Sequence, residues 1–153
     1  QDCWAQPRVL RGRVGQVVWS GVRPMAPKDD KTTPVDKLRA FQRSHQANKR
    51  CADCPERGPT YVCLDFQIFV CQSCGGLHRE FGHKIKSISF SEWTSAEVAT
   101  LEEGGNEAAR AKLAGWHEDI FPEPDGTNPE AVRDFIGLKY VEKRWRAPGA
   151  KPA

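Results

Sequence analysis

Apolar residues first recur with helical spacing about thirty residues into the chain. Val35, Leu38 and Phe41 fall on one face of a helix with 3.6 residues per turn. Thr33 precedes this run as an N-cap, and the proline after it suits the first helical position. The pattern therefore predicts a helix over residues 33–46.

The next apolar stretch has the character of short strands. Residues 60–64 and 67–70 are rich in β-branched and aromatic side chains, and the turn dipeptide Gly58-Pro59 precedes them. These two runs predict a β-hairpin. Cys63 lies within the hairpin, where a small buried thiol is more common than a metal ligand.

Helical patterns dominate the remainder of the chain. Residues 72–81 have helical periodicity, and the alternation over residues 85–90 predicts one more strand. Further helix starts and stops predict helices over residues 95–103 and 106–113 and from Asn128 onward. We therefore predict an α+β fold: a small domain with a three-stranded sheet flanked by about five helices.

Composition and charge narrow the classes of protein that are possible. The hydrophobic fraction is 39%, below the roughly 45–50% of globular domains, so one modest core is expected. No run of 18 apolar residues occurs, which excludes a membrane span. The net charge of +3 is segregated, because residues 92–134 hold 11 acidic and 3 basic side chains, whereas residues 28–50 hold 3 acidic and 7 basic.

Four of the six cysteines form two C-x-x-C pairs. Cys51 and Cys54 are separated by 16 residues from Cys71 and Cys74. This spacing favours a metal site over disulfides, because each pair presents two thiolates from one tight turn. Two such turns complete a tetrahedron around Zn²⁺ and leave no position for water or substrate. The sequence thus predicts one structural zinc ion.

The ends of the chain show no sustained hydrophobic period. Residues 1–32 are predicted to be a disordered N-terminal extension and residues 147–153 a frayed C-terminus, on either side of one domain over residues 33–146. The only methionine is Met25. We therefore expect residues 1–24 to be dispensable for folding.

An arginine follows the second cysteine pair at a defined offset. Arg79 lies five residues after Cys74, on the helix predicted to begin at the metal site. Here the chain resembles the ArfGAP zinc-finger family, whose pattern C-x2-C-x16-C-x2-C-x4-R it matches at every term. The resemblance covers about residues 35–146 and includes Gly76-Leu77-His78-Arg79, Lys86-Ser87-Ile88, Trp93, Gly105-Asn106 and Lys139-Tyr140-Val141-Glu142. The stretch from Gly58 to Val62 is similar to the plant ArfGAP and HRB-type, nucleoporin-like subgroup.

The resemblance implies a function and a set of functional residues. It implies a GTPase-activating protein for Arf-family small GTPases in vesicle trafficking, which binds the GTP-bound partner and is not itself an enzyme. Arg79 would enter the partner's active site, where a guanidinium can bind two phosphate oxygens at once. The partner-binding residues implied are Tyr61, Leu77, His78, Lys86, Trp93 and Asn106. The sequence has no P-loop, so we expect no nucleotide binding by this chain itself.

Three alternatives compete with this interpretation. The family's tryptophan is replaced by Tyr61 and its aspartate by Ser91, which suggests a catalytically silent zinc-finger scaffold that binds Arf or trafficking partners. Arg79 could instead cap a helix or pair with a neighbouring glutamate. A GATA-like nucleic-acid finger would need a basic recognition helix, but residues 72–81 offer Arg79 against Glu80, so direct nucleic-acid binding is not expected.

The resemblance also implies a location. We expect a cytoplasmic protein, peripheral on Golgi or endosomal membranes. No lipid-binding module is recognisable in the sequence, so membrane recruitment is expected only through other segments or partners.

Overall fold

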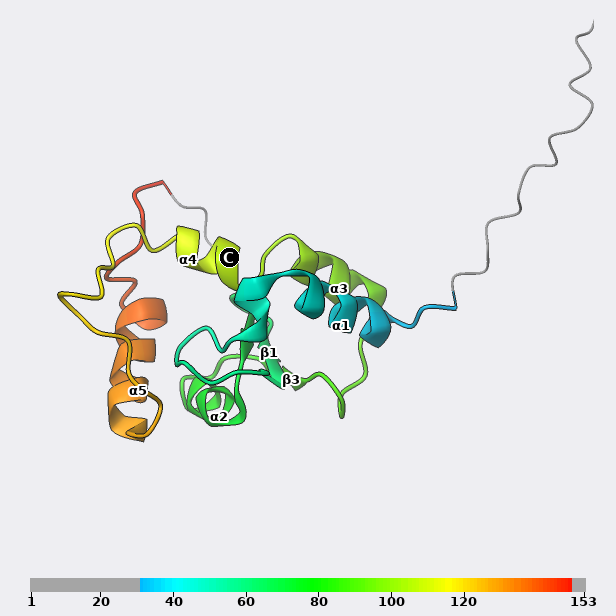
Figure 1. Ribbon diagram of the computed structural model, residues 1–153, viewed down its shortest axis with the longest axis horizontal. Coiled ribbons are helices and arrows are strands. Elements are labelled where there is room, and N and C mark those ends of the chain that lie inside the picture. Colours follow the sequence, from blue (N-terminus) through cyan, green and yellow to red (C-terminus); the bar gives the residue numbers. More distant parts are fainter. Residues whose placement is uncertain (1–30, 150–153) are drawn as a thin grey trace, which may run out of the picture. The chain divides into compact units, whose positions relative to one another are not determined.

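The computed structural model describes residues 31–149, in which five α-helices surround a small antiparallel sheet (Figure 1). The helices are α1 (Pro34–Ser44), α2 (Gln72–Glu80), α3 (Ser95–Glu102), α4 (Asn106–Ala111) and α5 (Pro129–Ile136). A 3₁₀ turn, η1 (Gln46–Lys49), follows α1, and a π-helical turn, η2 (Gly137–Val141), follows α5. The strands are β1 (Tyr61–Cys63), β2 (Ile68–Val70) and β3 (Ile85–Ser87). The predicted α+β fold is confirmed.

Most of the predicted N-terminal extension and the last four residues lie outside the described part of the chain. Within residues 31–149, none of the helices has the length and apolar character needed to cross a membrane.

Local hydrogen bonds explain where the predicted helices begin. The Thr33 hydroxyl accepts from the Asp36 backbone N–H at 3.2 Å, and the Asp36 carboxylate accepts from the Thr33 N–H at 3.1 Å. This capping box satisfies donors that the first turn leaves without intrahelical partners. Thr94 and Glu97 repeat the same arrangement at the start of α3.

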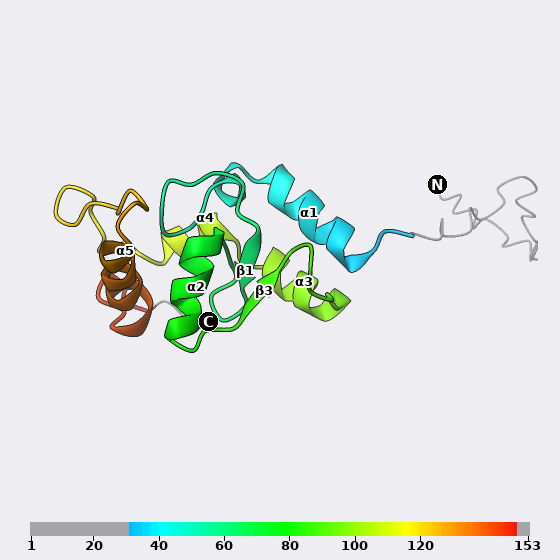
Figure 2. The same cartoon turned by 90° about the horizontal axis from the view of Figure 1, so that it is seen from below.

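The sheet separates two apolar clusters. Its strand order is β2-β1-β3, and both pairings are antiparallel. Val62 and Phe69 join a cluster with α1 and α3, whereas Cys63, Ile68 and Val70 face α2, α5 and the cysteine pairs. Successive strand residues point to opposite faces, so even three-residue strands serve both clusters. Figure 2 shows β1 with α2 on one side and α1 and α3 on the other.

The third strand is shorter than predicted. It ends at Ser87, and not at Phe90, because serine side chains at and after this position hydrogen-bond to the backbone. The Ser91 hydroxyl accepts from the Ser87 N–H, and the Ser87 hydroxyl accepts from the Phe90 N–H, both at 3.1 Å. The Trp93 indole N–H donates to the Ser87 carbonyl at 3.1 Å. The result is a braced turn that leaves Phe90 93% exposed.

Candidate metal centre and arginine site

The four paired cysteines converge at the start of α2. Cys71 is the N-cap of α2 and Cys74 lies in its first turn, while Cys51 and Cys54 come from the loop after η1. All four are buried, and their sulfurs lie within 4.8 Å of one another. The Cys54 and Cys71 sulfurs are 3.7 Å apart. Four thiols at these separations can hold one metal ion.

Backbone amides also point at two of these sulfurs. The Cys71 N–H donates to the Cys51 sulfur at 3.3 Å, and the Cys74 N–H donates to the Cys71 sulfur at 3.4 Å. Such hydrogen bonds favour the thiolate form that a metal requires. Cys63 lies outside this group. Burial raises the pKa of its thiol to about 12, so it stays protonated and packs as a small apolar residue.

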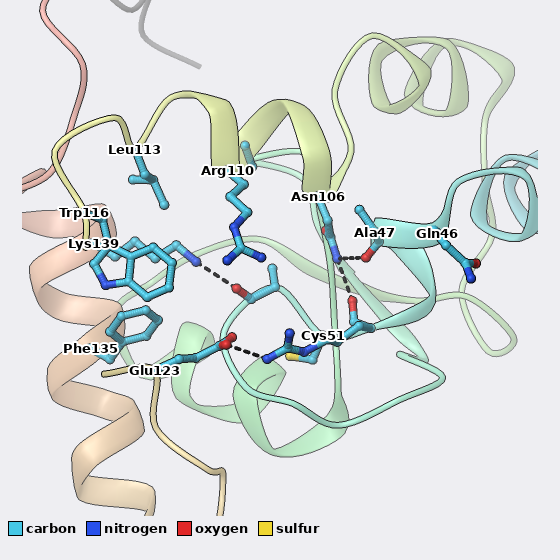
Figure 3. Close-up of a pocket in the computed structure, with 13 residues that line it drawn as sticks. Gln46, Ala47, Cys51, Asn106, Arg110, Leu113, Trp116, Glu123, Phe135 and Lys139 are labelled. Carbon is cyan, nitrogen blue, oxygen red and sulfur yellow. Dashed lines mark hydrogen bonds and ion pairs between the residues drawn. The ribbon is translucent and has the colours of Figure 1, made fainter. Parts of the chain in front are cut away.

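Asn106 fixes the strand and the turn that lead into the metal centre. Its carboxamide oxygen accepts from the Phe69 N–H at 2.7 Å, and its NH₂ group donates to the carbonyls of Arg50 at 2.7 Å and Ala47 at 3.1 Å (Figure 3). Gly105 precedes it with φ of +93°, in the region that favours glycine. A Cβ at Gly105 would also lie 3.1 Å from the Asn48 side-chain oxygen.

A buried ionic network ties the C-terminal part of the domain to the first cysteine pair. Asp53, fully buried between Cys51 and Cys54, accepts hydrogen bonds from Lys139 Nζ, His78 Nε2 and Tyr140 Oη, each at 2.8 Å. Lys139 also donates to the Ala52 carbonyl at 2.8 Å (Figure 3). Burial opposes ionisation of Asp53, but Lys139 and His78 outweigh it and hold the pKa of this carboxyl well below its usual range.

Replacing Lys139 by methionine is expected to destabilise the metal-bound domain by about 3 kcal/mol, because it leaves a buried carboxylate without its main counter-charge. Urea unfolding measures this loss. Arg133→Met provides the control, since it breaks only the exposed pair in which Arg133 Nε lies 2.8 Å from Glu80 Oε2. Equal midpoints for the two variants would contradict the structural role of the Asp53 network.

Arg79 lies in the last turn of α2 with its side chain exposed. Its guanidinium carbon is 5.4 Å from the centroid of the Tyr61 ring, a cation–π contact. Among residues 31–149, no carboxylate forms an ion pair with it. The neighbouring Glu80 is paired with Arg133 instead. The alternative in which Arg79 pairs with a nearby glutamate is therefore wrong.

The six predicted partner-binding residues do not all lie on the surface. Tyr61 and Lys86 are partly exposed, whereas the other four are buried: Leu77, His78, Trp93 and Asn106. His78 is fully buried, with its Nδ1 lying 2.8 Å from His83 Nδ1 and its Nε2 bonded to Asp53. Their side chains pack inside the free domain, where they can position the surface residues, and their part in partner binding stays a prediction.

Lys86 and Trp93 show how this positioning works at the edge of the sheet. The Lys86 ammonium lies 5.3 Å from the centroid of the Trp93 ring and 2.6 Å from the Glu97 carboxylate. It also donates to the Glu92 carbonyl at 3.0 Å. These contacts hold the segment between β3 and α3 against the start of α3.

Four cysteines in two C-x-x-C pairs that converge on one site are typical of zinc-finger domains. Residues 35–149 match the ArfGap family, described as "Putative GTPase activating protein for Arf". The chain therefore belongs to the ArfGap family. This confirms the resemblance found in the sequence.

Individual relatives confirm the subgroup as well. The chain is 46% identical over 99 residues to "Probable ADP-ribosylation factor GTPase-activating protein AGD14" of Arabidopsis thaliana, covering 64% of this chain and 15% of that protein. It is 39% identical over 104 residues to human "Arf-GAP domain and FG repeat-containing protein 1", covering 66% of this chain and 18% of that protein. Thus the chain spans less than a fifth of these relatives.

A solved structure supports the fold independently. The ArfGap domain of HIV-1 Rev binding protein superposes with a TM-score of 0.67 at 35% identity, covering 75% of this chain and 88% of that one. The two chains therefore share the ArfGap fold.

Sequence reasoning missed Asp53 and Lys139 as partners. The two residues are 86 positions apart, and no local pattern joins them. Two sequence features could have indicated the pair. Asp53 lies between two predicted metal ligands, and Lys139 lies within an otherwise apolar helical stripe.

Proposed function

We propose that this domain activates GTP hydrolysis by an Arf-family GTPase, with Arg79 as the catalytic arginine supplied in trans. The observation that carries the proposal is an exposed guanidinium without an ion-pair partner among residues 31–149, held over Tyr61 by a helix that begins at the metal centre. Membership of the ArfGap family supports the identity of the partner.

The chemistry required of Arg79 is electrostatic. During hydrolysis, negative charge develops on the oxygens of the transferred phosphoryl group, and a planar guanidinium can hydrogen-bond to two of them. A flexible arginine would lose conformational freedom on reaching this position. Tyr61 restricts the guanidinium beforehand, so an aromatic ring at this position supports the finger even though it is not tryptophan.

We propose that the ion at the metal centre is Zn²⁺ in a structural role. For tetrahedral geometry, a Zn–S bond of about 2.3 Å requires sulfurs about 3.8 Å apart. The separation of 3.7 Å between the Cys54 and Cys71 sulfurs fits this value. Four protein ligands complete the coordination, so the residues of the centre order α2 and do not activate water.

Single-turnover hydrolysis by purified, GTP-loaded Arf proteins tests this function. Adding the domain is expected to raise the rate by about 10³–10⁵-fold for at least one Arf protein. A panel of Arf proteins identifies the partner. Binding to GTP-bound Arf without any rate increase would contradict the proposal and favour the silent scaffold instead.

A further inference from the structure

A groove lined by basic side chains lies between α1, the segment before β1 and the turn after β3. Its volume is about 540 Å³, and four basic side chains line it: Arg39, Arg43, Lys49 and Arg57. Of the residues that the structure describes, none of those lining the groove is acidic. Among residues 31–149, none of the four cations forms an ion pair with a carboxylate. Asp36 is close enough to interact electrostatically with Arg39 and Arg43, but its carboxylate is held in the capping box of α1.

An exposed aromatic residue directly follows a groove residue in the chain. Ser89 lines the groove, and its hydroxyl accepts from the Arg39 guanidinium at 3.2 Å. The next residue, Phe90, is 93% exposed. Because Ser87 and Ser91 brace the turn by hydrogen bonds, the ring is presented to solvent by a fixed backbone.

We propose that this groove and Phe90 form a docking face for the anionic surface of a lipid bilayer. Cations without carboxylate partners are attracted to acidic headgroups, each contributing to binding near the surface. An aromatic side chain that is exposed in water gains free energy when it enters the headgroup region. An acidic polypeptide would satisfy the cations but gives no reason for a solvent-exposed phenylalanine on a hydrogen-bonded turn.

The uneven distribution of charge along the chain also favours binding of the bilayer at the groove. Residues 92–134, which carry 11 acidic and 3 basic side chains, contribute none of the residues that line the groove. A bilayer with negative surface potential therefore attracts the groove and repels this acidic segment. The proposed docking face differs from the expectation that only other segments or partners provide membrane recruitment, and that expectation stays untested. The proposal of a docking face does not depend on the GTPase-activating role.

Vesicle binding without any GTPase tests the proposal. The probes are phosphatidylcholine vesicles with and without phosphatidylserine, and the measurement is the partition coefficient of the whole chain by co-sedimentation. We expect binding only to the vesicles that contain phosphatidylserine, and weaker binding as salt is raised. Replacing Arg43 and Lys49 together by glutamine should lower the partition coefficient about 25-fold, or roughly 5-fold per cation.

Matched control variants test whether binding depends on the groove and Phe90, and not on the total charge or on any exposed apolar residue. Lys143 and Arg144 are exposed and lie outside the groove, so their double replacement by glutamine removes the same charge and should leave binding unchanged. Phe90→Ser should weaken binding roughly 10-fold. This change is smaller than full burial of a phenylalanine would give, because the ring enters only the headgroup region. Ile120→Ser, at a residue that is 80% exposed elsewhere, should have no such effect.

Three results would overturn the proposal: no binding to phosphatidylserine vesicles, equal losses in the groove and control variants, or unchanged binding of Phe90→Ser. Poly-glutamate that binds the wild type and Phe90→Ser equally, while vesicles bind neither, would identify an acidic polypeptide as the ligand. Because no Arf protein is present, failure here leaves the hydrolysis assay unaffected.

Discussion

Replacement of Arg79 by lysine is expected to lower Arf-stimulated GTP hydrolysis by at least about 10²-fold, against the 10³–10⁵-fold that an arginine finger contributes. Lysine keeps the charge but offers a single ammonium in place of a planar fork, so it cannot contact two phosphate oxygens in the same way. The side chain is exposed and forms no ion pair within residues 31–149. Melting temperature and metal content should therefore stay at wild-type values.

Arg110→Lys is the matched control for this experiment. Arg110 is also exposed, and its guanidinium carbon lies 5.5 Å from the centroid of the Trp116 ring, so it repeats the cation–π arrangement of Arg79 away from α2. Single-turnover rates and Arf binding should be measured for both variants. Undiminished hydrolysis with Arg79→Lys, beside an active wild type, would assign the finger to another residue.

The parts of the fold that sequence predicted well depend on short-range chemistry. Thr33 and Thr94 cap helices through residues only three positions away, and the C-x-x-C pairs define their own ligand turns. Interactions between residues this close in the sequence can be predicted from short sequence patterns. The predicted hairpin succeeded for a related reason, because its two runs adjoin and their β-branched and aromatic residues suit strands.

The failures occurred where distant or competing hydrogen bonds decide the structure. Alternation continues to Phe90, yet Ser87 and Ser91 end the strand through side-chain contacts that hydrophobic patterning does not report. Likewise, the family motifs include His78 and Asn106, but motifs do not reveal burial. Their side chains are used inside the domain, His78 on Asp53 and Asn106 on backbone groups of residues 47–69.

The candidate site contains both surface residues and buried residues, and the two groups have different roles. In the proposed function, the exposed Arg79 and the partly exposed Tyr61 act on the GTPase, while the buried residues around them determine whether α2 and β1 stay in place. Substitutions of His78 or Asn106 are therefore expected to act through stability. Measurements of activity in such variants have physical meaning only beside a measurement of folding.

Removal of the metal should have the largest effect on the fold. Structural zinc in small fingers contributes about 10–16 kcal/mol of apparent binding free energy at pH 7, more than the roughly 5–15 kcal/mol by which a typical domain is stable. The four cysteines form part of the apolar cluster under α2 and α5. Chelation is expected to abolish the thermal transition and the near-UV circular dichroism of the domain.

Chelation should unfold the whole domain and not only the apolar cluster that contains the cysteines. The reason is that β1 and β2 contribute side chains to both apolar clusters. Val62 and Phe69 pack with α1 and α3 only while the same strands are held by their other face. Cys51→Ser should reproduce chelation. Cys63→Ser is the control, since it places a hydroxyl in the same cluster without removing a ligand and should cost about 1–3 kcal/mol. A chelated sample with an unchanged thermal transition would show that the apolar clusters alone suffice.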